Sequence, residues 1–229
     1  MTTNNQTTLS IGVIGLGAMG KGMASSLRRA GHHVGVCDVR FDAAEAFAKE
    51  GGTAHQTPAD LAKHVDIIVS VVVNADQTEQ VLFGENGAAA HLKAGSLFIM
   101  CSTVDPNWSV ALEKRLNDMG LLYLDAPISG GAAKAASGQM TMMTSGQAAA
   151  YAKAGNALES MAANVYKLGD RAGYGSKVKI INQLLAGVHI AAAAEAMALG
   201  LREGVAADAL YEVITNSAGN SWMFENRMA

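Results

Sequence analysis

Residues 11–20 read IGVIGLGAMG, and this stretch decides the fold class. The apolar run Ile11–Ile14 predicts a short buried strand, and Met19–Arg29 predicts a helix. The turn between them has the GxGxxG spacing typical of a loop that binds a dinucleotide, because strand, glycine turn and helix follow one another in the required order. The stretch therefore predicts the opening unit of a dinucleotide-binding α/β domain.

Each glycine of this turn has a predicted part in holding the cofactor. Gly15 permits the tight turn, Gly17 lets the backbone approach a pyrophosphate, and Gly20 allows the helix and the strand to pack closely. The helix N-terminus faces the negative charge. A glycine turn without a ligand is the weaker alternative. We assign cofactor binding to the whole turn, which comprises Gly15, Leu16, Gly17, Ala18, Met19 and Gly20.

A carboxylate at the end of the second predicted strand bears on the choice of cofactor. Asp38 follows the apolar run Val34–Cys37 and lies 18 residues after Gly20. At that place it would accept hydrogen bonds from the adenosine ribose and repel a 2′-phosphate, which favours NAD over NADP. Arg40 lies two residues on and would partly offset that repulsion. The alternative for Asp38 is a residue that only caps a turn.

Strands and helices alternate along the next hundred residues. Predicted strands lie around Thr53 and at Asp66–Val73, Ser96–Cys101 and Leu121–Asp125, and predicted helices lie at Ala43–Glu50, from Thr57, at Gln77–Phe83 and from Asp105. The run IIVSVVV within Asp66–Val73 lacks polar alternation, as expected of a parallel strand covered on both faces. This order predicts a Rossmann-type, doubly wound α/β fold with a mostly parallel sheet.

Beyond these elements the pattern is less regular. Two further predicted strands, Gln139–Thr144 and Val165–Leu168, flank a predicted helix at about Ala148–Ala162, and we expect them to extend the same sheet at its far side. From Ser176 to Gly200 the sequence predicts one long alanine-rich helix, followed by another at Ala207–Thr215.

The change of composition near the glycines at 169–175 predicts a domain boundary. We expect an NAD-binding domain over residues 1–172 and the start of an all-α substrate and dimerisation domain over residues 173–229. At about 55 residues the second part is too small to bury a full core alone. It is therefore expected to pack on the first domain and on a partner subunit, in a homodimer or homotetramer.

Composition excludes several classes of function. The net charge is −3, 16% of residues are charged, and no run of lysines or arginines occurs, so we expect neither a nucleic-acid nor a membrane partner. The first eight residues lack the features of a signal peptide, and no uninterrupted apolar run is long enough to span a bilayer. The sequence predicts a cytoplasmic protein that acts on a small molecule.

Cysteines and histidines give no sign of a metal or a disulfide. Cys37 and Cys101 each end an apolar run, which predicts buried strand residues without chemistry. The six histidines are scattered without the spacing of metal ligands, so we expect no metal site.

Ligands of parallel sheets bind beyond the carboxyl ends of the strands, which directs attention to three more segments. Val72 and Val73 end one predicted strand and Thr103 follows another, so we assign them to the cofactor. In DAPISGG, the segment Ser129–Gly131 offers a hydroxyl and two backbone amides after a third strand, which suits a carboxylate. An ordinary glycine-rich turn is an equal alternative for that segment.

A polar trio lies early in the long predicted helix. Lys179, Asn182 and Gln183 share one helix face, since they are three and four residues apart. A lysine beside a hydroxyl-bearing carbon can transfer a proton if its surroundings bring its pKa toward the working pH. Lys177 lies about 200° around the helix and is expected to be a solvated charge.

Three motifs together resemble one family, the beta-hydroxyacid dehydrogenases, which include 3-hydroxyisobutyrate dehydrogenase and tartronate semialdehyde reductase. GVIGLGAMG resembles the family's cofactor signature, DAPISGG its substrate loop and GYGSKVKIINQ its catalytic helix. The resemblance implies that Ser129, Gly130 and Gly131 bind the substrate carboxylate. It implies further that Lys179 is the general acid/base, that Asn182 orients the substrate and that Gln183 is an additional contact.

The resemblance also implies a difference in length. Relatives continue past the helix near Trp222 into more helices, including a lysine that closes over the cofactor, whereas this chain stops at Ala229. We therefore expect a shortened helical part.

The sequence is compatible with three functions. The leading one is NAD-dependent oxidation or reduction of a small hydroxy acid, with Lys179 moving the hydroxyl proton. A non-catalytic nucleotide-binding module is the alternative of another class, and it would not need Lys179. An imine or NADP-linked reductase would predict a different residue at 179 and basic residues in place of Asp38.

Overall fold

The computed structural model describes residues 8–229, which form two compact units. The first unit ends at Lys179 and the second begins at Ile180. This division falls within one helix, a few residues beyond the predicted boundary at 172/173, and each unit is described separately.

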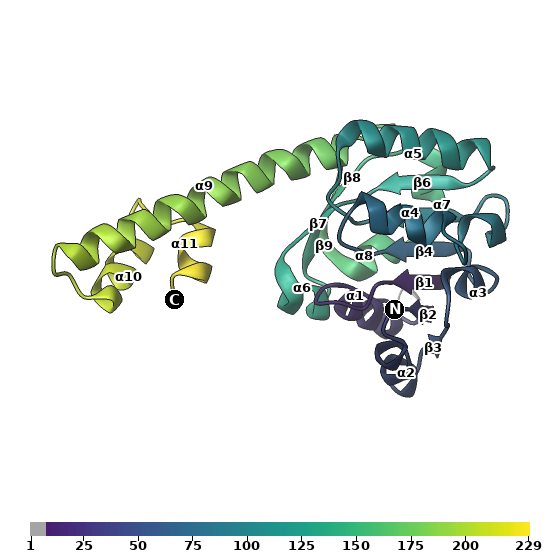
Figure 1. The fold of residues 1–229 in the computed structure, drawn as a ribbon, viewed down its shortest axis with the longest axis horizontal. Coiled ribbons are helices and arrows are strands. Elements are labelled where there is room, and N and C mark those ends of the chain that lie inside the picture. Colours follow the sequence, from purple (N-terminus) through teal and green to yellow (C-terminus); the bar gives the residue numbers. More distant parts are fainter. Residues whose placement is uncertain (1–7) are drawn as a thin grey trace, which may run out of the picture. The chain divides into compact units, whose positions relative to one another are not determined.

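A six-stranded parallel sheet forms the centre of the first unit (Figure 1). Its strand order is β3-β2-β1-β4-β5-β6, and this arrangement confirms the predicted doubly wound, parallel sheet. The strands are β1 (Ser10–Ile14), β2 (His33–Cys37), β3 (Thr53–Ala54), β4 (Ile67–Ser70), β5 (Leu97–Met100) and β6 (Leu122–Asp125). Because the order reverses direction between β1 and β4, the carboxyl ends of these two strands form the crevice where such folds bind ligands.

Helices cover both faces of this sheet (Figure 1). Consecutive residues of β4 alternate between two hydrophobic cores, with Ile67 and Val69 on one face and Ile68 on the other. On the first face Leu27 of α1 packs against the sheet, and on the second Leu61 of α3 does so. The helices from α1 to α5 are α1 (Gly20–Arg29), α2 (Phe41–Lys49), α3 (Pro58–Ala62), α4 (Ala75–Phe83) and α5 (Pro106–Asp118), with a short 3-10 helix at Ala89–His91.

The last three strands do not extend the main sheet, so that prediction is wrong. They form a second sheet of order β7-β8-β9, in which β7 is antiparallel and β9 parallel to β8. After Asp125 the chain turns away from β6, and an isolated bridge between Asp125 and Ser145 links the two sheets. The strands are β7 (Ile128–Ser129), β8 (Met140–Thr144) and β9 (Ala162–Lys167).

Two features of this region were not predicted. A short helix, α6 (Gly131–Ser137), follows β7 directly. The single predicted helix over Ala148–Ala162 is instead a pair, α7 (Ala148–Ala154) and α8 (Ala157–Met161). Gly155 separates the pair with a φ of +53°, a backbone conformation that glycine adopts without strain and that ends a helix.

The long predicted helix is present as α9 (Tyr174–Arg202). Its first turns belong to the first unit and its remainder, with α10 (Ala207–Thr215) and α11 (Trp222–Arg227), to the second. Within the second unit, Tyr211 of α10 stacks on Phe224 of α11 with ring centroids 6.0 Å apart. This unit is helical throughout, as expected from its lack of strand patterns.

The expectation of no membrane-length apolar segment needs correction. Among the described residues one helix, α9, is long and apolar enough to cross a membrane by length and composition, with a mean hydropathy of 1.7 in its most apolar window. The prediction concerned uninterrupted apolar runs, and residues such as Asn182 and Glu195 interrupt this one. Core helices of soluble proteins meet the same criterion, so this correction concerns the length of the apolar segment alone.

Candidate active site

The glycine turn between β1 and α1 has the geometry that a dinucleotide loop requires. Gly15 has a φ of +92°, and its N–H donates to the carbonyl of Cys37 at 2.9 Å. A side chain at Gly20 would overlap the carbonyl oxygen of Gly15. A Cβ added at Gly17 would meet nothing within 4 Å, so open space lies against this backbone. The turn therefore has room for a ligand at the residue predicted to approach the pyrophosphate.

The N-terminus of α1 supports this interpretation. No side chain caps it, and its first turn carries no acidic residue. The unpaired N–H groups at such a terminus favour a bound anion. A pyrophosphate fits both the open space at Gly17 and these free donors.

Asp38 lies beside the glycine turn, as predicted. Its carboxylate accepts hydrogen bonds from the N–H of Leu16 at 2.6 Å and from the N–H of Arg40 at 2.8 Å. The first of these bonds fixes the carboxylate next to the cofactor turn, and the second is the local turn cap considered as the alternative. The Nε of Arg40 lies 3.9 Å from the carboxylate, close enough to offset part of its charge.

The other residues assigned to the cofactor lie at the carboxyl ends of β4 and β5. Val73 and Thr103 are exposed, while Val72 is half-buried and its carbonyl accepts a bond from Ser102 Oγ at 2.8 Å. Val39, directly after Asp38, is fully exposed.

The serine-glycine segment lies next to the cofactor helix. Ser129 ends β7 and pairs with Thr141. Gly130 and Gly131 follow with φ values of +139° and +80°, which only glycine adopts readily, and turn the chain into α6. Helix α6 packs closely on α1, where Ser26 Oγ donates to the carbonyl of Ala135 at 3.1 Å. The structure thus brings the predicted carboxylate-binding segment and the predicted cofactor helix into one region of the first unit.

A buried carboxylate that the sequence argument did not single out holds the start of α9. Asp125 Oδ2 accepts from the N–H groups of Gly173 and Ser176, both at 2.9 Å, and Oδ1 accepts from Ser176 Oγ at 2.7 Å. Ser145 Oγ donates to the same carboxylate at 3.2 Å and accepts from the N–H of Gly175. Burial raises the pKa of Asp125, and these hydrogen bonds oppose that rise.

Asp125 therefore acts as a helix cap supplied from β6. The carboxylate satisfies N–H groups that α9 cannot bond within itself, and its charge complements the helix dipole. Since Asp125 also begins the DAPISGG segment, one side chain links the loop that leads to Ser129 to the helix that carries Lys179. A second carboxylate, Glu113 of α5, accepts from the N–H of Ala172 at 3.1 Å and helps to hold the same turn.

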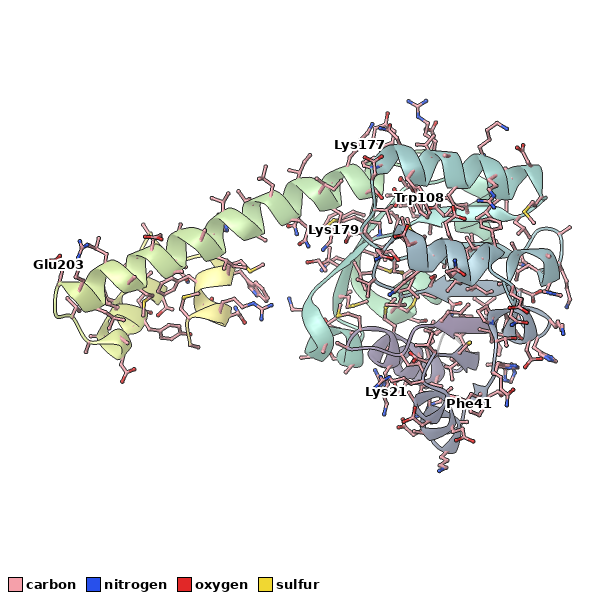
Figure 2. The ribbon with its side chains drawn as sticks, in the orientation of Figure 1. Lys21, Phe41, Trp108, Lys177, Lys179 and Glu203 are labelled. Atoms are coloured by element: carbon pink, nitrogen blue, oxygen red, sulfur yellow. The ribbon has the colours of Figure 1, made fainter. Side chains whose placement is uncertain are left out.

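Lys179 lies one turn beyond this cap, near the start of α9 (Figure 2). It is almost completely buried, with 7% of its surface exposed. Burial lowers the pKa of Lys179 below its usual value. Among residues 8–229, no carboxylate forms an ion pair with it. A buried amine without a counterion is easily deprotonated, which is the property that a general base requires.

The neighbours of Lys179 on α9 differ in exposure. Lys177 is exposed and lies 5.0 Å over the ring of Tyr174, in agreement with the expected solvated charge. Asn182 and Gln183 follow Lys179 by about one helical turn, and Asn182 is partly buried whereas Gln183 is exposed. Their assignment to the substrate stays a prediction.

Both cysteines are free and buried, as predicted. Burial raises the pKa of Cys37 to about 11, and burial also raises the pKa of Cys101 well above its usual value. Neither thiol has the depressed pKa of a nucleophile.

A doubly wound sheet with this open glycine turn and an adjacent strand-end aspartate defines the class of dinucleotide-binding oxidoreductase domains. Residues 10–169 match the family described as the NAD binding domain of 6-phosphogluconate dehydrogenase, and residues 173–229 match the family described as NAD-binding of NADP-dependent 3-hydroxyisobutyrate dehydrogenase. The chain belongs to the beta-hydroxyacid dehydrogenase family and is an oxidoreductase of small hydroxy acids with an NAD-binding domain. This confirms the resemblance inferred from the motifs.

Individual relatives agree with this family. The chain is 63% identical over 219 residues to the L-threonate dehydrogenase of Cupriavidus necator. The aligned region covers 96% of this chain and 74% of that protein. It is 49% identical to the L-threonate dehydrogenase of Escherichia coli, over 95% of this chain and 72% of that protein. The crystal structure of 3-hydroxyisobutyrate dehydrogenase from Salmonella typhimurium superposes on this chain with a TM-score of 0.91 and is 48% identical to it in sequence. The match covers 96% of this chain and 77% of the Salmonella chain.

Proposed function

We propose that the protein oxidises L-threonate to 2-oxo-tetronate with NAD as the oxidant. The proposal rests on the name of the relative at 63% identity together with the buried, unpaired amine of Lys179, which is the observation that carries the chemistry. Oxidation of a secondary alcohol requires removal of the hydroxyl proton, and Lys179 is a candidate base that burial has already prepared for this step.

Each group of the chain has one task in this proposal. Ser129 donates its hydroxyl, and Gly130 and Gly131 donate backbone N–H groups, to the substrate carboxylate. Lys179 accepts the proton of the hydroxyl at the carbon to be oxidised, and Asn182 orients that hydroxyl. NAD, when bound at the glycine turn, supplies the hydride acceptor.

The choice of NAD over NADP is supported by Asp38. Its carboxylate is held against the cofactor turn by the N–H of Leu16, where a 2′-phosphate would meet a negative charge. The exposed apolar side chains of Val39 and Val73 are available to pack against the adenine ring. Arg40 reduces the repulsion without removing it, because its Nε lies 3.9 Å from the carboxylate.

We also propose that the protein is a cytoplasmic homo-oligomer without a membrane or nucleic-acid partner. Support for association comes from α9, where Ile181, Leu184 and Val188 are each more than half exposed. An apolar surface of this kind is stabilised by burial against another subunit. Light scattering of the purified protein would contradict this proposal if it gave the mass of a monomer.

The test of function is the initial rate of NAD reduction with L-threonate, D-glycerate and 3-hydroxyisobutyrate. We expect the highest kcat/KM with L-threonate and a loss of about 10²–10⁴-fold in kcat for Lys179→Ala. Lys177→Ala is the matched control, since this neighbouring lysine is exposed and should leave the rate unchanged. Full turnover by Lys179→Ala would refute the assigned base, and NAD binding without turnover of any acid would favour a non-catalytic nucleotide-binding module.

A further inference from the structure

Three potential metal ligands come together outside the candidate active site. His55 follows β3, Asp60 lies in α3, and His64 lies just beyond that helix. The Nδ1 of His55 is 2.9 Å from Asp60 Oδ2, and the Nε2 of His64 is 3.9 Å from Asp60 Oδ1. One ligand atom from each of the three lies within 4.8 Å of the others. No metal site was predicted here, because the spacing His-x₄-Asp-x₃-His matches no familiar metal motif.

The scaffold beneath these side chains is fixed. Leu61 of α3 is fully buried and packs so closely on the sheet that a Cβ added at Gly12 or Gly35 would lie 2.9 Å or 2.7 Å from its side chain. Thr57 caps the helix, since its hydroxyl accepts from the N–H of Asp60 at 3.1 Å. The carboxylate is thus attached to a helix whose position and first turn are set by other residues.

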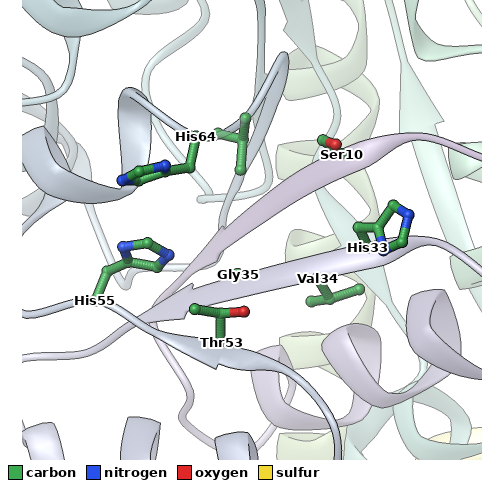
Figure 3. A pocket seen from close by; sticks show the side chains of 8 residues that line it. Ser10, His33, Val34, Gly35, Thr53, His55 and His64 are labelled. Atoms are coloured by element: carbon green, nitrogen blue, oxygen red, sulfur yellow. The ribbon is translucent and has the colours of Figure 1, made fainter.

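A cavity of about 350 Å³ lies beside the cluster. Figure 3 shows the side chains that line it, including those of His55 and His64. The rings of His55 and His64 line it, together with the hydroxyl-bearing residues Ser10 and Thr53. Ser10 and Thr53 are the first residues of β1 and β3, whereas the cofactor turn follows the last residue of β1. The cavity therefore lies on a different part of the sheet from the dinucleotide crevice, and it has room for water.

The donor set indicates which ion would fit. Two imidazole nitrogens and one carboxylate oxygen suit Zn²⁺ and similar ions, whereas Mg²⁺ and Ca²⁺ prefer oxygen ligands. Bonds of about 2.1 Å at tetrahedral angles place ligand atoms about 3.4 Å apart. The 2.9 Å and 3.9 Å separations run to different oxygens of Asp60, and one ligand atom from each residue lies within 4.8 Å of the others, so the side chains must move closer to a shared ion. Small side-chain adjustments would therefore complete the site.

We propose that His55, Asp60 and His64 bind a divalent transition-metal ion of the Zn²⁺ class, with water from the cavity as the remaining ligand. The ion takes the place of the proton that His55 and Asp60 share, and His64 moves to become the third protein ligand. The bound ion then connects the end of β3 to both ends of α3. The site contributes stability to the dinucleotide-binding domain rather than chemistry.

The test is a titration of untagged, metal-free protein with Co²⁺, in the absence of NAD, followed by visible absorption and competed with Zn²⁺. We expect saturation at one equivalent and displacement of Co²⁺ by Zn²⁺. His64→Ala should weaken Zn²⁺ affinity by more than about 10-fold, since loss of even an outer-shell partner commonly costs 10–100-fold. His64 is 61% exposed, so this variant should fold. His91→Ala, another exposed histidine, is the control and should bind as the parent does.

Two results would overturn the proposal. One is the absence of saturable binding at one equivalent, which would leave a simple hydrogen bond between His55 and Asp60. The other is equal Zn²⁺ affinity in the parent and in His64→Ala. Asp60→Asn, which keeps the side-chain shape but removes the charge, provides a second variant and should also lose the ion.

Discussion

Replacement of Gly175 by alanine is the most direct test of how α9 is positioned. Gly175 lies in the first turn of α9, between the cap provided by Asp125 and the buried Lys179. A Cβ added there would overlap the carbonyl oxygen of Met143 and lie 3.0 Å from that of Asp125. Backbone atoms cannot rotate away as a side chain can, so the helix start itself must move.

The expected magnitude follows from two opposing effects. Alanine is favoured over glycine in a helix by about 0.5–1 kcal/mol. Overpacking of a close contact costs about 1–3 kcal/mol. The net expectation for Gly175→Ala is a destabilisation of about 1–2 kcal/mol, which lowers Tm by roughly 2–8 °C for a protein of this size. Displacement of Lys179 by about 1 Å would also reduce kcat by about 10²-fold, because a misplacement of that size typically lowers the rate of the catalysed step by this factor.

Thermal denaturation and steady-state kinetics provide the assays. Gly187→Ala is the matched control, since it makes the same substitution on the same helix where an added Cβ meets nothing within 4 Å. This control should raise Tm slightly and leave the rate unaltered. If Gly175→Ala were as stable and as active as the parent protein, the proposed coupling between the cap and Lys179 would be wrong.

Four further predictions concern single groups. Ser176→Ala removes the hydroxyl that donates to a buried carboxylate, and urea denaturation should show a loss of about 1.5–3 kcal/mol; an unchanged midpoint would contradict this. Oxidation needs the neutral amine of Lys179, and burial lowers the pKa of this residue from the ordinary lysine pKa of 10.5. We therefore expect kcat/KM to rise with pH and to level off below pH 10.5. A rise that continues past pH 10.5 would contradict this prediction. Asp38→Ala should raise the preference for NADP relative to NAD by about tenfold, equivalent to about 1.4 kcal/mol, and equal ratios in both proteins would argue against its role. Because burial raises the pKa of Cys37 to about 11, this thiol should resist a disulfide reagent at neutral pH until the protein is unfolded.

Local patterns predicted most of the main sheet. The run around Ile67 reads as a buried strand because both of its faces meet helices, and the glycine turn is recognisable because its spacing is a property of consecutive residues. The same holds for α9, whose alanine-rich composition favours a helix in any context. The helical break at Gly155 was missed because a glycine can be accommodated within a helix or can end one, and tertiary packing decides between them.

The features that sequence could not supply depend on distant residues. From sequence alone, strand β8 could either pair with β6 or belong to a separate sheet. The chain turns after Asp125, and β8 lies in the separate sheet. Asp125 itself contacts residues 48 and 51 positions further along the chain, which no local pattern reveals. The arrangement of His55 and His64 about Asp60 likewise requires the ring orientations to be known. In each case the missing information is a contact rather than a propensity.

The strand order has a consequence for how the protein folds as it is synthesised. Ile11 of β1 pairs with Val34 of β2 on one side and with Ile67 of β4 on the other. The second pairing closes a long loop before it gains any stabilising contact, and parallel pairings of this kind form slowly. A nascent chain that ends before β4 would expose an unpaired apolar edge of β1. Emergence of β4 from the ribosome therefore covers this edge of β1 and moves the open edge to β4, which stays a target for chaperones and for aggregation until β5 pairs with it.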